Sequence, residues 1–118
     1  MEIKTFRAGA DIPAHRFVKF GTNEGEVVLA TSAADTVIGV SDDVDTDAGN
    51  EIDIFMGVVT KVQYGEAVAQ GNGIVAGENG KAVKAAEADV ENETEAETPI
   101  AVALASCVAD EVDYFKFL

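Results

Sequence analysis

The side chains best suited to chemistry in this sequence are the aspartates of residues 42–49, which read DDVDTDAG. Three of them alternate with other residues, as the first carboxylate ligands of a calcium loop do: Asp43, Asp45 and Asp47. The match then fails, because Ala48 stands where such a loop needs glycine and Ile54 where it needs a bidentate glutamate. We therefore interpret the run as a solvated connection whose aspartates cap turns, with a cation site as the alternative.

Paired carboxylates, which glycoside hydrolases use, occur twice along the chain: Glu51 with Asp53, and Glu111 with Asp113. Residues two apart on a strand share one face, so each pair is also what simple alternation produces. This alternation predicts that the intervening apolar residues are buried: Ile52, Ile54, Val112 and Tyr114. Structural alternation is the simpler account. The acidic run between Glu87 and Glu97 is interpreted as a solvated loop.

The remaining candidates for catalysis are isolated residues. His15 lies at a strand entrance without a recognisable nucleophile motif, so we expect a surface or interface residue. Cys107 lies between two apolar strands, where a small semi-buried hydrophobe explains it. Gly80 and Lys81 are followed by Ala82, so no phosphate-binding loop is present. The sequence predicts that the protein is not an enzyme and binds no cofactor.

The charge balance restricts the partners. The 118 residues carry 22 acidic and 8 basic side chains, a formal net charge of -14. Nucleic acids and anionic membranes attract clustered Lys and Arg, so neither is expected as a partner. Hydrophobic residues make up 47% of the chain, which is enough for one folded core. The start, MEIKTFRAGA, lacks a secretion-signal pattern and there is a single cysteine, so we expect synthesis in a reducing, cytosolic compartment.

The elements that position these residues are predicted to be strands. Apolar residues fall in short runs with a period near two, separated by glycine-bearing turns, which is typical of an all-β domain. Two of these turns, at residues 21–25 and 77–80, carry the Asn and Gly residues that tight hairpins need. The predicted strands cover residues 2–6, 16–20, 27–30, 37–41, 51–56, 58–63, 74–76, 82–84, 100–105 and 112–117.

The strand pattern repeats once. The segment IGV at 38–40 leads to NEIDIF at 50–55, as IAV at 100–102 leads to DEVDYF at 110–115. We infer two similar β units, at approximately residues 8–57 and 64–118, within one domain covering residues 8–118. Two such units would close into a small barrel or sandwich. Residues 1–7 are left as an extended N-terminal arm that pairs within the chain or with a neighbour.

Five segments rich in turn glycines and short apolar steps carry a resemblance to a known family: residues 8–12 (AGADI), 36–41 (TVIGVS), 49–59 (GNEIDIFMGVV), 69–75 (AQGNGIV) and 80–83 (GKAV). Together they span nearly the whole chain, which resembles the bacteriophage capsid cement or head decoration proteins, a family once mislabelled as a recombinase. The sequence departs from the family pattern at residues 100–102, where glycine is usual.

The resemblance implies a structural virion protein on the outer surface of a phage head. Its partners would be the major capsid protein and further copies of the chain, with a trimer favoured and a dimer possible. The arm would add a strand to a capsid subunit or sister protomer through four interface residues: Ile3, Thr5, Phe6 and Arg7. The alternative is a small β module of a surface structure that binds calcium or carbohydrate.

Overall fold

The computed structural model describes residues 2–57, 59–87, 91 and 96–118. The regular secondary structure of this part is all β-strand apart from the short 3-10 turn η1 (Glu78–Gly80), so the predicted all-β class is confirmed. None of its helical segments is long and apolar enough to cross a membrane. All ten predicted strands are present: β1 (Ile3–Ala8), β2 (Phe17–Phe20), β3 (Glu26–Leu29), β4 (Gly39–Ser41), β5 (Glu51–Phe55), β6 (Val59–Gln63), β7 (Gly73–Ala76), β8 (Ala82–Lys84), β9 (Ala101–Ala103) and β10 (Val112–Phe117).

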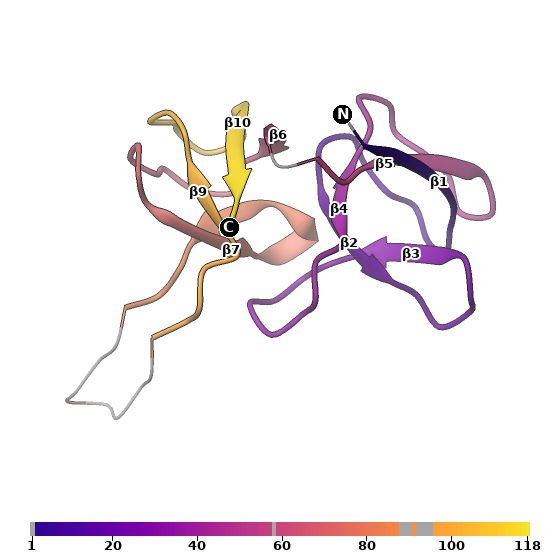
Figure 1. The fold of residues 1–118 in the computed structure, drawn as a ribbon, viewed down its shortest axis with the longest axis horizontal. Coiled ribbons are helices and arrows are strands. Elements are labelled where there is room, and N and C mark those ends of the chain that lie inside the picture. The colour runs from indigo at the N-terminus through magenta and orange to yellow at the C-terminus, as the bar shows by residue number, and fades with distance from the viewer. Residues whose placement is uncertain (1, 58, 88–90, 92–95) are drawn as a thin grey trace.

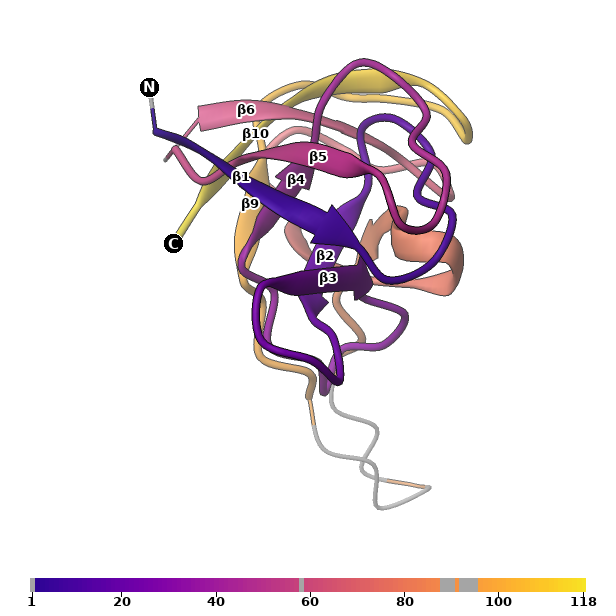
Figure 2. The same ribbon diagram turned by 90° about the vertical axis from the view of Figure 1, so that its right-hand side faces the viewer.

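The strands form two lobes that lie side by side (Figure 1). The first lobe, β1–β5, is a closed barrel with the strand order β1-β3-β2-β4-β5. The second lobe, β6–β10, is a five-stranded sheet with the order β6-β10-β9-β7-β8. Figure 2 shows β1, β5, β6 and β10 grouped along one side of the molecule.

The two lobes repeat one topology. The first lobe contains the β2–β3 hairpin and the second lobe the β7–β8 hairpin. Read from the second strand of its hairpin, the strand order is β3-β2-β4-β5-β1 in the first lobe and β8-β7-β9-β10-β6 in the second. A parallel contact between β1 and β3 closes the first lobe, and the parallel bridge between Tyr64 and Ala82 lies at the same place in the second. The bridge between Ile12 and Thr46 is likewise matched by that between Val68 and Cys107. The chain is therefore an internal duplication.

Strand β1 corrects the predicted repeat boundaries. It pairs with β5 over residues 3–7 and with β3 at Arg7 and Ala8, as β6 pairs with β10 in the second lobe. The repeated units are therefore residues 3–55 and 59–117, rather than 8–57 and 64–118. Residues 3–7 belong to a barrel wall and are not a free arm, because pairing with β5 satisfies backbone groups that would otherwise form an open sheet edge.

Left-handed backbone conformations recur at matching positions. Gly49 and Asp110 have φ values of 89° and 69°, and their amides donate to the equivalent carbonyls of Ala8 and Tyr64. Residue His15, at φ 57°, lies in the position that Gly71 fills in the second lobe at φ 89°. A side chain makes this conformation costly, so His15 and Asp110 hold backbone strain that glycine avoids in the other copy.

One hydrophobic core joins the lobes. A smaller cluster fills the first barrel and includes Ile12, Val18 and Ile54. The larger cluster combines residues of both lobes, among them Phe17 of β2 and Phe115 of β10, which are fully buried. The lobes therefore form one domain and are not independent units.

Polar contacts fix the junction between the lobes. The backbone amide of Gln63 donates to the carbonyl of His15 at 2.8 Å. The Nε and Nη2 atoms of Arg16 donate to Oε1 of Gln63, and Nη1 donates to the carbonyl of Asn79. Burial lowers the pKa of Arg16, while Asp45 and Asp110 favour its charged form. The junction is thus held by a satisfied cation as well as by apolar packing.

Candidate interaction surface

Strands β6 and β10 present an unusual outer face. Their register sets Val112 opposite Gln63, Tyr114 opposite Lys61 and Lys116 opposite Val59. The side chain of Tyr114 is 49% exposed and Val59 is 47% exposed. The ammonium of Lys61 lies 5.0 Å from the ring centre of Tyr114, within cation–π range. Large apolar side chains and lysines therefore share a solvent-facing sheet surface.

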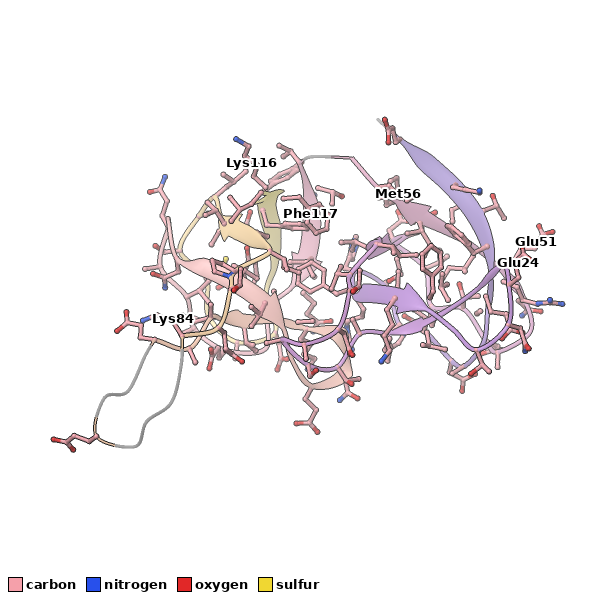
Figure 3. All side chains as sticks on the ribbon, turned by 60° about the horizontal axis from the view of Figure 1, so that its bottom comes forward. Glu24, Glu51, Met56, Lys84, Lys116 and Phe117 are labelled. Carbon is pink, nitrogen blue, oxygen red and sulfur yellow. The ribbon has the colours of Figure 1, made fainter. Side chains whose placement is uncertain are left out.

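This surface continues onto the first lobe. Phe55 points outward from β5 opposite Ile3, and with Val59, Lys61 and Tyr114 it lines a cleft of about 250 Å³ between the lobes. Figure 3 shows Lys116 of the second lobe and Met56 of the first along the same edge of the molecule. We call the outward side chains at this junction the seam face: Ile3, Phe55, Val59, Lys61, Leu104, Val112, Tyr114 and Lys116.

The seam face carries lysines, and the carboxylates of Asp42 and Asp43 line the same cleft as Lys61. Among the described residues, Lys61 and Lys116 form no ion pair, although the chain carries a net charge of -14. Three other cations are neutralised by ion pairs: Arg7 with Glu26, Lys19 with Asp35, and Lys81 with Asp110. An apolar surface with available lysines is suited to binding another protein.

The duplication shows that this surface is not a requirement of the fold. The first-lobe positions that match Val112 and Tyr114 are Glu51 and Asp53, which are exposed carboxylates. Oδ1 of Asp53 accepts a 2.6 Å hydrogen bond from the Thr5 hydroxyl, so this face of the first lobe is polar. At these two positions the wall is thus acidic in the first lobe and apolar in the second.

The structure corrects the predicted burial of Val112 and Tyr114, which are 41% and 49% exposed. The predicted alignment set Asp53 against Asp113, whereas the hydrogen bonds from Ala8 to Asn50 and from Tyr64 to Glu111 set Asp53 against Tyr114. A slip of one residue moves every side chain of a strand to the other face. The predicted burial of Ile52 and Ile54 in β5 is confirmed.

The four predicted interface residues are separated by the β1 pleat. Ile3 is 51% exposed and joins the seam face beside Phe55. Thr5 binds Asp53, and Arg7 lies 3.7 Å from Glu26. Phe6 points the other way and packs against the first-lobe core, where its ring lies 6.2 Å from that of Phe20. The sequence analysis did not identify Phe55, Lys61 and Tyr114 as surface residues. The pattern that could have indicated this surface is the alternation of lysines with apolar residues on the two paired strands β6 and β10.

The aspartates of residues 42–49 act on the backbone. Oδ1 of Asp45 accepts from the amide of Ala14 at 2.9 Å, and Oδ1 of Asp42 accepts from that of Asp43 at 2.7 Å. Asp11 likewise accepts from the amide of Ala48. The predicted local capping is confirmed for Asp42, whereas Asp45 bonds the backbone of a distant loop at Ala14.

Among the described residues, ligand atoms of Cys107, Glu111 and Asp113 lie within 4.8 Å of one another. Cys107 is buried, as predicted for a small hydrophobe. Burial raises the pKa of its thiol, and the nearby Asp113 and Glu111 raise it further.

The acidic run between Glu87 and Glu97 is only partly described. Its ends are joined by the amide of Glu97, which donates to the carbonyl of Ala86, and by the amide of Ala86, which donates to Oε1 of Glu97. The predicted solvated loop at residues 88–90 and 92–95 lies outside the described residues.

No protein-family model matches the chain, and no curated protein matches it significantly. A solved structure with a similar fold is the head fiber gp8.5 N base of bacteriophage phi29, which superposes with a TM-score of 0.74 at 17% sequence identity. The match covers 99% of this chain and 93% of the phage protein. The similarity therefore extends over both lobes.

Proposed function

We propose that the protein is a structural component of a bacteriophage virion that binds the outside of the head and stabilises the capsid lattice. The observation that carries this proposal is the fold likeness to a phage head fiber base over 99% of the chain. The sequence resemblance to head decoration proteins points in the same direction. The role is structural and not enzymatic, because capping, strand pairing and junction contacts account for Asp45, Thr5 and His15.

The seam face is the surface we assign to the capsid. A protein with a net charge of -14 is repelled by other acidic proteins, so lysines on a contact surface reduce that repulsion. Lys61 and Lys116 supply this positive charge beside Asp42 and Asp43, and Tyr114 supplies the aromatic anchor typical of interface hot spots. The partner is the major capsid protein, whose repeated subunits offer the same site many times.

The protein binds as an oligomer, for which we favour a trimer over a dimer. Linked copies that engage a lattice together raise the overall affinity well above that of a single contact. This arrangement does not use residues 1–7 as a donated strand, because β1 is paired inside its own barrel.

The proposal is tested by binding the purified protein to expanded heads of the phage that encodes it. Wild-type protein should sediment with the heads at a fixed ratio to the major capsid protein. Tyr114→Ser and Lys61→Glu should each lower the affinity about tenfold or more, since they remove an anchor or reverse a contact charge. Absence of wild-type binding at micromolar protein would overturn the proposal.

The matched control is Lys84→Glu. Lys84 is exposed and lies on the second lobe well apart from Lys116 of the seam face (Figure 3). The variant makes the same change in net charge as Lys61→Glu. If both weaken binding equally, overall charge and not the seam face governs attachment.

A further inference from the structure

Three metal-ligating side chains converge where the chain enters β10: Cys107, Glu111 and Asp113. Their ligand atoms, the sulfur and one oxygen from each carboxylate, lie within 4.8 Å of one another. A zinc ion lies about 2.3 Å from a thiolate sulfur and about 2.0–2.2 Å from a carboxylate oxygen. Ligand atoms gathered this closely therefore reach a single ion after small side-chain rotations.

Backbone contacts hold all three ligands in place. Oε1 of Glu111 accepts from the amide of Val108 at 3.1 Å, and Oδ1 of Asp113 accepts from the next amide of the strand at 2.7 Å. Cys107 is fixed by its bridge to Val68, in which each amide donates to the other carbonyl at 3.0 Å. Each hydrogen bond uses one carboxylate oxygen and leaves a second one on the same group. The cluster is thus organised before any ion binds.

The carboxylate of Asp113 is turned toward the interior of the second lobe. Tyr114 faces outward, so its neighbours Asp113 and Phe115 share the inner face of β10. Phe115 and Val62, the register partner of Asp113, are both fully buried. Among the described residues, neither Asp113 nor Glu111 forms an ion pair. A carboxylate directed at an apolar core is costly unless a cation compensates it, so this position favours cation binding.

The first lobe has the same topology without these ligands. Matching bridges and hydrogen bonds identify the first-lobe counterparts of the cluster, none of which is an acid or a thiol: Thr46, Asn50 and Ile52. The side chain of Ile52 is 2% exposed and belongs to the apolar core of its barrel. The fold therefore does not require a thiol and two carboxylates at this end of a lobe. Their convergence is a property of the second copy alone.

We propose that Cys107, Glu111 and Asp113 bind a zinc ion, with water as the fourth ligand of a tetrahedral site. The sulfur ligand selects zinc over Ca²⁺ and Mg²⁺, which take oxygen ligands. Glu111 is exposed, so the site opens to solvent on its side. The ion joins the connection after β9 to the start of β10 and thereby stabilises this end of the second lobe.

Zinc binding is coupled to loss of the thiol proton. The bond forms between zinc and the thiolate sulfur of Cys107, and the proton is released to solvent. Burial and the charges of Asp113 and Glu111 raise the pKa of this thiol in the protein without metal. A divalent cation compensates both carboxylates at once, so the same charges that disfavour a free thiolate favour the bound ion.

The test uses the full chain with its thiol reduced and any bound metal removed by EDTA. Calorimetric titration with zinc chloride should show saturable binding of a single ion. Cobalt chloride should produce a thiolate-to-cobalt charge-transfer band that zinc removes and that excess magnesium chloride leaves intact. Zinc should also raise the midpoint of thermal unfolding.

Substitutions of the ligands separate this site from general attraction of cations. Cys107→Ser should abolish the cobalt band, and it should fold because Thr46 places a hydroxyl at the same position in the first lobe. Asp113→Asn should lower the zinc affinity about tenfold or more.

The matched control is Asp110→Asn. It removes the same charge from the same loop, and Asn tolerates the left-handed φ of 69° at this position. The Asp110 carboxylate binds Lys81 at 2.8 Å and is not part of the cluster, so the variant should bind zinc as wild type does.

A wild-type protein without the cobalt band, or a Cys107→Ser variant that retains it, would overturn the inference. Equal loss of zinc affinity in Asp113→Asn and Asp110→Asn would also overturn it, because bulk charge would then attract the ion. Zinc binding is measured without phage heads, so this site and the proposed function fail separately.

Discussion

The Phe17 ring of the first lobe lies edge-on to the Phe115 ring of the second, with centroids 5.3 Å apart and an interplanar angle of 78°. Both side chains are fully buried, and Phe117 packs against each of them. Each lobe contributes an aromatic residue to the same core, so the two lobes share the larger hydrophobic cluster. The contact between these two rings therefore helps to hold the two lobes together.

Phe17→Ala should be one of the most damaging substitutions in the chain. It removes a buried ring from the shared core, which typically lowers the free energy of unfolding by about 3–5 kcal/mol. Urea unfolding measures the loss. Phe20→Ala, at an exposed ring, should cost less than about 1 kcal/mol. Equal losses for the two variants would show that the core does not depend on Phe17.

The left-handed residue at the lobe junction gives a second prediction. His15 has φ 57°, where its counterpart is Gly71. His15→Gly should therefore stay within about 1 kcal/mol of wild type, because relieved strain offsets the greater freedom of the unfolded chain. His15→Val should lose about 1–2 kcal/mol, since a β-branched side chain tolerates this conformation poorly. Thermal unfolding of both variants tests this, and a fully stable valine variant would contradict it.

Asp35 should make stability depend on acid pH. The backbone amide of Thr31 and the ammonium of Lys19 donate to its carboxylate and hold its pKa below 3.8. A lowered pKa contributes stability above the unfolded value, and this is lost as pH falls through the folded value. Asp35→Asn should thus be less stable by up to about 1 kcal/mol at neutral pH and equal to wild type near pH 2. A difference that persists in acid would contradict this account.

Cys107 should react slowly with alkylating reagents. Burial, followed by Asp113 and Glu111, raises the pKa of its thiol, so little thiolate is present at about pH 8. Iodoacetamide should modify the folded protein at least tenfold more slowly than the protein in guanidinium, as followed by mass spectrometry. Equal rates in the two conditions would mean that the thiol is exposed.

Much of the fold could be predicted from the sequence because it depends on local patterns. Alternation located all ten strands, and the Asn-Gly turn at Asn79 and Gly80 has the positive φ values that such residues favour. The duplication was also visible in the echo of β5 by β10. These signals are contained in neighbouring residues, so no tertiary information was needed.

The boundaries and the candidate site could not be predicted in the same way. Whether β1 is an arm or a barrel wall depends on β5, which lies far away in the sequence. Whether the side chain of Tyr114 is buried or exposed depends on how the second repeat is aligned with the first. An alignment that is wrong by one residue assigns the side chain to the opposite face of the sheet. The seam face joins Phe55 to Tyr114 across two lobes, and only their packing brings these residues together.

The central claim is attachment to the outside of a phage head through the seam face. Cryo-electron microscopy of expanded heads incubated with the protein tests it most directly. We predict two-lobed density at regular positions on the outer surface, with Lys61 and Tyr114 directed toward the shell. Heads without added density, or density with that face turned to solvent, would contradict the account.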